Sequence, residues 1–242
     1  MNRIFINWCC CIVVFFFSSQ ALADTVSGSV PSKRTTEFSW MSVNTWDKMH
    51  AEDALIAQYD QVDLLFVGDS ITAGWNWDVW QKNFAPHKAA NFGIGGDHTG
   101  NVLWRLQHGA IGNIQPKVIV LLIGVNNFGH LNETPEQVAN GVAKVVQQLQ
   151  LAWPNSKILL NAVFPFDQDA ESPNRKKVKE LNKLISKLQN KNTIVFKDYG
   201  SLMLQEDGSI SPEIMGDFLH PTAKGYQIWA DAMTPDILEL LK

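Results

Sequence analysis

Ser70 is the residue of this sequence whose type and position most clearly allow chemistry. It follows an apolar run from Leu64 to Val67 through Gly68 and Asp69, so it stands directly after the carboxyl end of a predicted buried strand. A serine hydroxyl is a weak nucleophile unless a neighbouring base accepts its proton. A reactive Ser70 would therefore need a base, a group that orients this base, and hydrogen-bond donors for the charge that develops on a substrate oxygen.

The base and its orienting group are predicted near the C-terminus. Asp217 and His220 are three residues apart in a predicted loop, just before Pro221 opens the last predicted helix. An aspartate paired with a histidine holds the imidazole in the tautomer that can accept a serine proton, and it stabilises the imidazolium that results. The residue types and the spacing therefore predict a catalytic triad of Ser70, His220 and Asp217.

Candidate oxyanion donors follow two other predicted strands. Gly96 lies in the glycine-rich stretch from Asn91 to Asp97, whose backbone can approach a ligand closely, and Asn126 follows the third apolar run. With the backbone N–H of Ser70, the N–H of Gly96 and the amide of Asn126 could form an oxyanion hole. Each residue alone is more typical of a turn or a helix cap. Parallel strands, however, would bring all of them to one edge of a sheet.

These segments resemble the four sequence blocks of the SGNH (GDSL) hydrolases, and they occur in the same order. The blocks are Gly68-Asp69-Ser70, the loop with Gly96, Gly124-Val125-Asn126, and Asp217 with His220. The resemblance implies that Ser70, Gly96, Asn126 and His220 are the four name-giving residues of that family and that Asp217 completes the triad. It also implies a flavodoxin-like α/β/α sandwich with five parallel strands in the order 2-1-3-4-5.

Within this family, residues 62–241 resemble the catalytic subunits of intracellular platelet-activating-factor acetylhydrolase. The similarity is strongest in the run from Asn91 to Asp97 and its continuation from Val102 to Leu106. In that subfamily three side chains border a small acyl pocket, and the matching residues here are Ile71, Val125 and Leu219. The resemblance therefore implies a serine esterase that prefers acetyl esters over butyryl and longer esters.

The spacing of apolar residues separately predicts an α/β fold, because runs of strand length alternate with amphipathic stretches of helix length. Strands are expected over residues 62–67, 88–92, 118–123, 157–163 and 193–197. Helices are expected over residues 46–59, 77–84, 99–108, 135–153, 173–190 and 222–241. The third strand has no polar alternation, as expected for a strand covered on both faces of a parallel sheet.

The N-terminus predicts export. Residues 1–23 combine a basic tip, a short apolar stretch and a small-x-small pattern, which is typical of a cleaved signal peptide rather than a membrane-spanning anchor. The three cysteines lie inside this stretch, so the mature chain can form no disulfide. We expect residues 24–37 to form a flexible leader, residues 38–242 to form one hydrolase domain, and the protein to be periplasmic or secreted.

Composition narrows the classes of partner. The formal net charge is −4, and basic residues are concentrated only in residues 175–179, which we interpret as a solvated helix face. We therefore expect no nucleic-acid partner. The histidines show no metal-ligand spacing and the glycines no complete dinucleotide motif, so we predict neither a metal nor another cofactor. The expected partner is a small-molecule or glycan ester, and the protein is expected to be a monomer or a homodimer.

Two alternatives stay open at this point. The same triad would serve an acyltransferase that passes the acyl group to a sugar hydroxyl. A non-catalytic glycan-binding module on the same fold could use the tryptophans that follow Ser70, which are Trp75, Trp77 and Trp80. Core packing is the favoured interpretation of these tryptophans, because large aromatic side chains usually contribute buried area.

Overall fold

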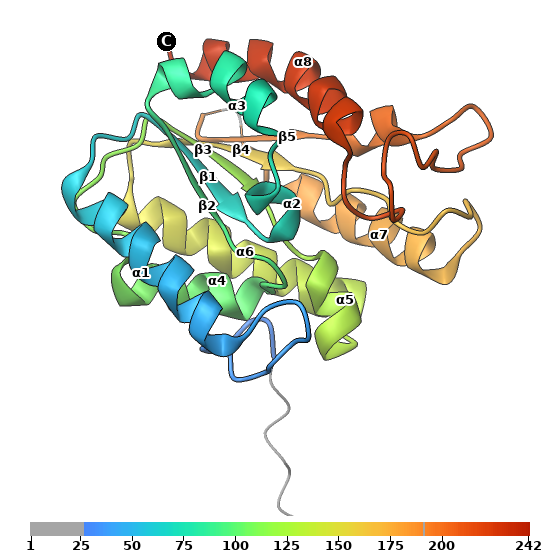
Figure 1. Cartoon of the computed structure of the whole chain (residues 1–242), viewed down its shortest axis with the longest axis horizontal. Coiled ribbons are helices and arrows are strands. Elements are labelled where there is room, and N and C mark those ends of the chain that lie inside the picture. Colours follow the sequence, from blue (N-terminus) through green and yellow to red (C-terminus); the bar gives the residue numbers. More distant parts are fainter. Residues whose placement is uncertain (1–26, 191) are drawn as a thin grey trace, which may run out of the picture.

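The computed structural model describes residues 27–190 and 192–242. The predicted signal peptide, residues 1–23, lies outside the described residues. The described chain forms a central sheet between two layers of helices (Figure 1). This is the three-layer α/β/α sandwich that the sequence predicts.

Five parallel strands form the sheet in the order β2-β1-β3-β4-β5, which confirms the predicted order. Their bounds are β1 Leu64–Gly68, β2 Ala89–Gly93, β3 Val118–Leu122, β4 Lys157–Asn161 and β5 Ile194–Lys197. Strands β1 and β3 are buried along their whole length, because helices cover both faces of the sheet. Gly68 at the end of β1 is in register with Gly93 of β2 and Leu122 of β3, so three strands end at one level.

The helices cover the sheet on both faces (Figure 1). Helices α3 and α8 pack together on one face, and α1, α4, α6 and α7 lie on the other, where α6 contacts both α4 and α7. Their bounds are α1 Val43–Tyr59, α2 Ser70–Ala73, α3 Trp77–Asn83, α4 Thr99–Arg105, α5 Val125–Leu131, α6 Pro135–Ala152, α7 Pro173–Ile185 and α8 Ala223–Leu240. Local hydrogen bonds fix where α6 begins: Thr134 and Gln137 form a capping box before this helix, and Pro135 stands at its first position.

The sequence pattern missed the two short helices that carry candidate site residues. Helices α2 and α5 have 4 and 7 residues, too few for an apolar period to be visible. The pattern also made two helices too long. Helix α4 gives way to a π-helical turn over residues 106–110, where Gly109 has a positive φ, and α7 tightens into a 3₁₀ turn over residues 186–188.

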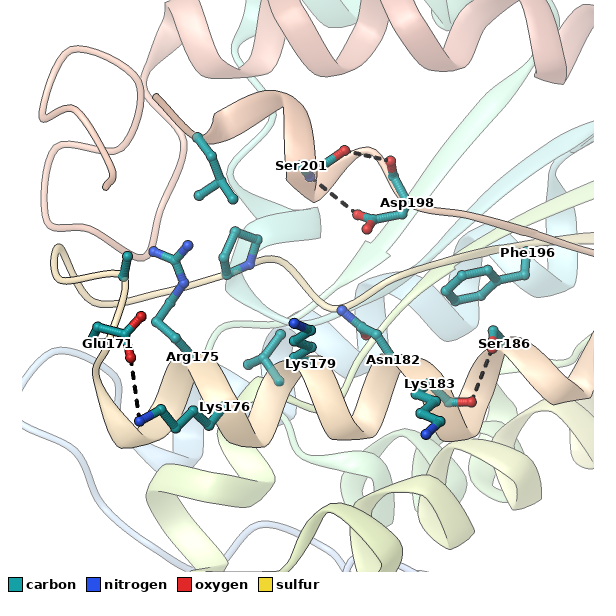
Figure 2. A pocket seen from close by; sticks show the side chains of 14 residues that line it. Glu171, Arg175, Lys176, Lys179, Asn182, Lys183, Ser186, Phe196, Asp198 and Ser201 are labelled. Atoms are coloured by element: carbon teal, nitrogen blue, oxygen red, sulfur yellow. Dashed lines mark hydrogen bonds and ion pairs between the residues drawn. The ribbon is translucent and has the colours of Figure 1, made fainter. Parts of the chain in front are cut away.

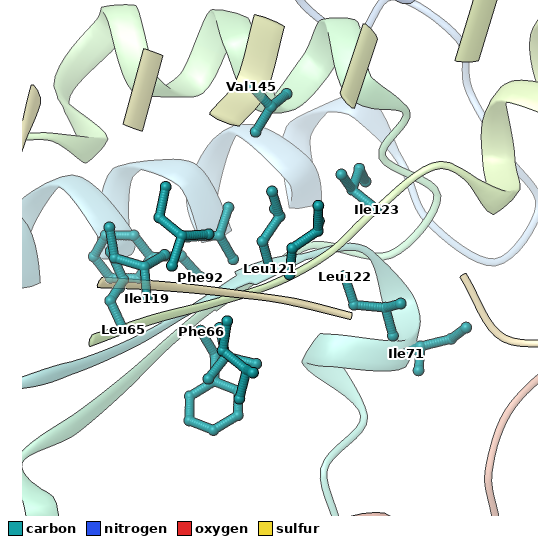
Figure 3. Close-up of a cluster of buried hydrophobic side chains, with 14 of the residues drawn as sticks. Leu65, Phe66, Ile71, Phe92, Ile119, Leu121, Leu122, Ile123 and Val145 are labelled. Atoms are coloured by element: carbon teal, nitrogen blue, oxygen red, sulfur yellow. The ribbon is translucent and has the colours of Figure 1, made fainter. Parts of the chain in front are cut away.

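A single apolar core joins the sheet to its helices. Figure 3 shows part of it, where side chains of β1, β2 and β3 meet Val145 of α6. Ile71, on the helical turn that follows β1, lies at the edge of this cluster and is 1% exposed. The core therefore extends up to the residue next to Ser70, and this fixes the turn that carries the serine.

Residues 27–37 are packed on the domain and do not form the flexible leader that the sequence predicts. The N–H of Gly28 donates to Glu133 Oε1 at 2.8 Å, the hydroxyl of Thr99 donates to Gly28 O at 2.7 Å, and the N–H of Ser32 donates to Gly100 O at 3.0 Å. Glu133 is itself buried. A polar segment with few apolar side chains is ordered here because its backbone groups find buried partners.

Among the helices of residues 27–190 and 192–242, none is both long enough and apolar enough to span a bilayer.

Candidate active site

The end of β1 places Ser70 at the start of α2. Asp69 caps this helix, since its Oδ1 accepts from the N–H of Ile71 at 2.9 Å. Gly68 is required before it, because a Cβ there would lie 2.4 Å from the carbonyl oxygen of Leu122. The N–H groups in the first turn of a helix have no acceptor inside the helix, so the N–H of Ser70 is available to a ligand.

The structure brings the three predicted triad residues into one chain of hydrogen bonds. Ser70 Oγ lies 2.8 Å from His220 Nε2, across 150 residues of sequence, and His220 Nδ1 lies 2.7 Å from Asp217 Oδ2. The first distance allows Ser70 Oγ to pass its proton to His220 Nε2, and the second allows Asp217 to hold the imidazole in place. With its proton on Nδ1, His220 would present an unprotonated Nε2 to the serine hydroxyl, as a general base must.

The loop from Asp217 to His220 is held by its own backbone. Asp217 Oδ1 accepts from the N–H groups of Leu219 and His220, at 3.1 and 2.7 Å. Phe218 has a φ of 60°, the left-handed region that side chains rarely adopt, and this lets the chain fold back on Asp217. Such strain persists only where the surroundings hold it, and it is common at functional sites.

Asp217 remains ionised although it is partly buried. Burial opposes its ionisation, but the hydrogen bonds from the side chain and the backbone of His220 together outweigh burial and lower the pKa of Asp217. An ionised Asp217 can stabilise a protonated His220. The Asp217 side chain is 58% exposed and that of His220 is 40% exposed, so this half of the site is open to water.

The candidate oxyanion donors Gly96 and Asn126 lie in and beside the loop that follows β2. The loop after β2 passes close to the serine, because a Cβ on Gly95 would lie 3.8 Å from Ser70 Cβ. Gly96 has a φ of 74°, which favours glycine. The side chain of Asn126, in the first turn of α5, donates to Asp97 O at 2.9 Å, so its amide is fixed beside the same loop.

A buried network of charges holds that loop. Asp97 is 0% exposed and accepts from Arg105 Nε at 2.8 Å, from Arg34 Nη2 at 3.2 Å and from Trp46 Nε1 at 2.6 Å.

The same two arginines also hold the backbone around the loop. Arg34 donates to Gly95 O at 2.6 Å. Arg105 reaches the carbonyl oxygens at the ends of β1 and β2, those of Gly68 and Phe92. These contacts fix Gly95, Gly96 and, through Asp97 O, the Asn126 amide.

The sequence pattern does not predict this network. The available signal was Arg105, an arginine inside the apolar run from Val102 to Leu106. A charged side chain in such a run must find a buried partner of opposite charge. Arg34 gave no comparable signal, because it lies in a polar segment.

The residues predicted to border the acyl group are all adjacent to site residues in the chain. Ile71 and Val125 are 1% and 6% exposed, and Leu219 is partly buried. Their apolar side chains pack in the core or against it. The role of Ile71, Val125 and Leu219 as an acyl pocket stays a prediction.

The tryptophans after Ser70 serve mainly in packing. Trp75 is 8% exposed and stacks on Trp229 with 4.4 Å between ring centroids. Trp80 packs against Phe66 at 5.0 Å. Trp77 is 71% exposed and lines a surface hollow together with residues that precede β1 and β2.

A second surface groove, with a volume of about 710 Å³, runs along α7 (Figure 2). It is lined by Arg175, Lys176 and Lys179 and also by Pro165 and Phe196. Lys176 pairs with the exposed Glu171 at 3.5 Å, and Arg175 donates to the carbonyl oxygens of Asp167 and Gly208. Most of these cations lie on an exposed helix face, which agrees with the solvated face that the sequence predicts.

The chemistry of the site comes from protonatable side chains and N–H donors. Throughout the part of the chain that the structure describes, no group of three or more His, Cys, Asp or Glu side chains is arranged to hold a metal ion. The arrangement around Ser70 can deliver an activated hydroxyl to a carbonyl carbon and can place donors where the oxyanion forms.

Comparison with known proteins agrees with this chemistry. The model of the GDSL-like Lipase/Acylhydrolase family matches residues 66–228. The rat platelet-activating factor acetylhydrolase IB subunit alpha2 is 38% identical over 204 residues, which cover 81% of this chain and 85% of the rat protein.

Solved structures share the fold. A GDSL-like lipase from Bacteroides thetaiotaomicron superposes with a TM-score of 0.66 at 24% identity, over 80% of this chain and 97% of the lipase. Est24, a carbohydrate acetylesterase from Sinorhizobium meliloti, superposes with a TM-score of 0.58 at 19% identity, over 74% of this chain and 99% of Est24. At these identities the likeness concerns the architecture.

Proposed function

Because the chain belongs to the GDSL-like lipase/acylhydrolase family and is a carboxylic ester hydrolase, we propose that it cleaves acetyl and other short-chain esters through an acyl-enzyme on Ser70. The observation that carries this proposal is the chain of hydrogen bonds from Ser70 through His220 to Asp217. The buried N–H of Gly96 and the partly buried amide of Asn126 would supply the second requirement of acyl transfer, donors for the oxyanion.

In the first half of the reaction, Ser70 Oγ attacks the ester carbonyl carbon while His220 Nε2 takes the hydroxyl proton. The oxyanion of the tetrahedral intermediate accepts hydrogen bonds from the N–H groups of Ser70 and Gly96 and from the Asn126 amide. The bond to the alcohol oxygen then breaks, and His220 gives that oxygen its proton. This leaves the acyl group on Ser70 and releases the alcohol.

In the second half, water replaces the alcohol. His220 takes a proton from the water, the resulting hydroxide attacks the acyl carbon, and the acid leaves as the proton returns to Ser70 Oγ. Asp217 stays ionised throughout and stabilises the imidazolium. The exposure of the His220 and Asp217 side chains supports water as the acceptor and makes hydrolysis the better candidate than transfer to a sugar hydroxyl.

The acyl group is proposed to be short. Ile71, Val125 and Leu219 are branched apolar residues adjacent to the nucleophile, the oxyanion donor and the base, so they would leave room for little more than a methyl group. We therefore expect faster turnover of p-nitrophenyl acetate than of p-nitrophenyl butyrate, and the slowest turnover with the octanoate. Faster hydrolysis of the octanoate would contradict the acyl-pocket assignment.

The alcohol half of the substrate is proposed to be a carbohydrate or a short-chain lipid. A lipid is suggested by the acetylhydrolase subunits that the chain resembles, and a carbohydrate by Est24, which has the same architecture. The apolar, signal-like sequence of residues 1–23 supports a place outside the cytoplasm, in the periplasm or the medium. Cell fractionation of the full chain, followed by N-terminal sequencing, tests this location.

The central experiment replaces Ser70 by Ala. Turnover of p-nitrophenyl acetate should fall about 10⁶-fold while the thermal unfolding temperature stays close to that of the unchanged protein. A fluorophosphonate probe should label the unchanged protein and not the Ser70→Ala variant. Absence of labelling in the unchanged protein would instead favour a glycan-binding module without turnover.

A further inference from the structure

We propose that Trp40 is a specificity-determining residue, a platform on which a sugar ring in the alcohol half of the ester stacks. This proposal rests on the proposed esterase function and narrows its substrate to an acetylated saccharide. It also gives the N-terminal segment from Arg34 to Met41 a place in the substrate site.

Trp40 borders the nucleophile. The edge of its six-membered ring lies over the loop that carries Gly95 and Gly96. If each glycine had a Cβ, Trp40 Cη2 would lie 2.7 Å from the Cβ of Gly96 and Trp40 Cζ3 would lie 3.4 Å from the Cβ of Gly95. The same point on Gly95 is 3.8 Å from Ser70 Cβ. The indole ring and the serine therefore approach one side of the same glycine, and a group leaving Ser70 in this direction meets Trp40.

The indole is both exposed and fixed, a combination typical of a binding surface rather than of core packing. Trp40 is 58% exposed, yet its ring stacks on Phe38 with 4.8 Å between centroids and 6° between planes. Phe38 and Met41 exchange two backbone hydrogen bonds, at 3.1 and 3.2 Å, so a tight turn carries Trp40. The Arg34 guanidinium lies 5.3 Å from the centre of the Phe38 ring, a distance at which a cation–π interaction also holds Phe38.

The surroundings of this stack suit a polyhydroxylated ring better than a lipid chain. On the side of Phe38 and Gly96, a cavity of about 580 Å³, which neither Trp40 nor Ser70 lines, is bordered by polar residues that include Ser32, Thr35, Thr36, Asn101 and His130. A sugar presents C–H groups to an aromatic face and hydroxyls to polar neighbours such as these. An alkyl chain in the same place would desolvate the polar groups without giving them hydrogen bonds.

The test compares Trp40→Ala with Trp77→Ala, a matched control that removes an equally large and more exposed indole from a hollow that Ser70 does not line. Activities are measured on acetylated xylo-oligosaccharides, on a phospholipid with an acetyl group at sn-2, and on p-nitrophenyl acetate. For Trp40→Ala, the ratio of kcat/KM on the saccharide to that on p-nitrophenyl acetate should fall about tenfold, mainly through KM. Trp40→Phe should restore part of the loss, and Trp77→Ala should leave the ratio unchanged.

A binding measurement separates this proposal from the esterase proposal itself. Titration of the Ser70→Ala variant with deacetylated xylo-oligosaccharide should quench tryptophan fluorescence, and the quenching should be lost when Trp40→Phe is added. An unchanged ratio for Trp40→Ala, an equal fall on all three substrates, or a wild-type preference for the phospholipid that Trp40→Ala abolishes would each overturn the assignment. If the unchanged protein hydrolysed none of the three esters, the proposed function would fail instead.

Discussion

Asp97 follows the glycine loop near Ser70 and Asp217 is hydrogen-bonded to the proposed base, but the protein surrounds the two aspartates differently. Asp97 has no exposed surface and is bound by two arginines and a tryptophan, whereas the side chain of Asp217 is 58% exposed and is bound within its own loop. The oxyanion side is thus built as a fixed frame, and the proton-transfer side is open to solvent. This division suits the chemistry, because oxyanion donors must be in place before charge develops, while the base must exchange protons with alcohol and water.

The two aspartates also differ in the range of their contacts. The hydrogen bonds of Asp217 come from Leu219 and His220, within three residues, so the loop largely defines itself. The partners of Asp97 come from residues 34, 46 and 105, three separate segments of the chain. We therefore expect changes at Asp217 to affect activity and changes at Asp97 to affect the fold.

The largest expected effect is on turnover at Asp217. Asp217→Asn should lower kcat on p-nitrophenyl acetate about 10⁴-fold, because the amide no longer selects the required tautomer of His220 or stabilises its charged form. Thermal unfolding should change little, since the side chain is mostly exposed. Steady-state kinetics and calorimetry on the same sample check both, and a collapse of the unfolding temperature would contradict the proposed division.

The next largest effect is on stability at Asp97. Asp97→Asn should lower the free energy of unfolding by about 3–5 kcal/mol, because it removes the carboxylate that two buried guanidinium groups share. Urea unfolding of the unchanged and variant proteins at pH 7 measures the difference. A loss below about 1 kcal/mol would mean that the two arginines do not depend on Asp97.

A smaller effect is expected at Asn126, the proposed oxyanion donor whose side chain is hydrogen-bonded to Asp97 O. Asn126→Ala should lower kcat about 10²–10³-fold by removing one oxyanion donor. The unfolding temperature should fall less than in Asp97→Asn, because the residue is only partly buried and gives one hydrogen bond to Asp97 O. Unchanged turnover would remove Asn126 from the oxyanion hole.

The smallest effect is on the pH dependence of stability. The pKa of Asp217 lies below its ordinary value of 3.8. The contribution of its ionised form to stability is therefore fully present above pH 3.8 and is lost as the pH falls from 3.8 through the lowered pKa. The small difference in unfolding temperature between the unchanged protein and Asp217→Asn should therefore shrink between pH 6 and pH 3. A difference that grew on acidification would contradict this sign.

The same distinction between local and distant contacts explains what the sequence could predict. The strand order came from the resemblance, and the positions of the strands were visible as continuous apolar runs such as Val118 to Ile123. Asp217 and His220 were recognisable as a pair because they are three residues apart, and Ser70 because a strand ends just before it. Each of these signals lies within one short stretch of chain.

The features that escaped prediction depend on contacts between distant segments. Nothing near Arg34 in the sequence reveals Asp97 as its partner, and nothing near Gly28 reveals Glu133, so residues 27–37 resembled a flexible leader. Trp40 lies just after that stretch, while the more conspicuous Trp75 fills the core. Aromatic residues alone do not disclose which of them border a site, because that depends on which backbone folds against them.

The distance of 150 residues between Ser70 and His220 has a consequence for biosynthesis. A chain leaving the ribosome contains the proposed nucleophile, Ser70, well before β5 and the loop after it supply the proposed base, His220. An incomplete product, or one degraded from its C-terminal end past residue 217, would therefore carry an inert serine. Under the proposed mechanism, a chain that ends before His220 carries Ser70 without its base and does not hydrolyse esters.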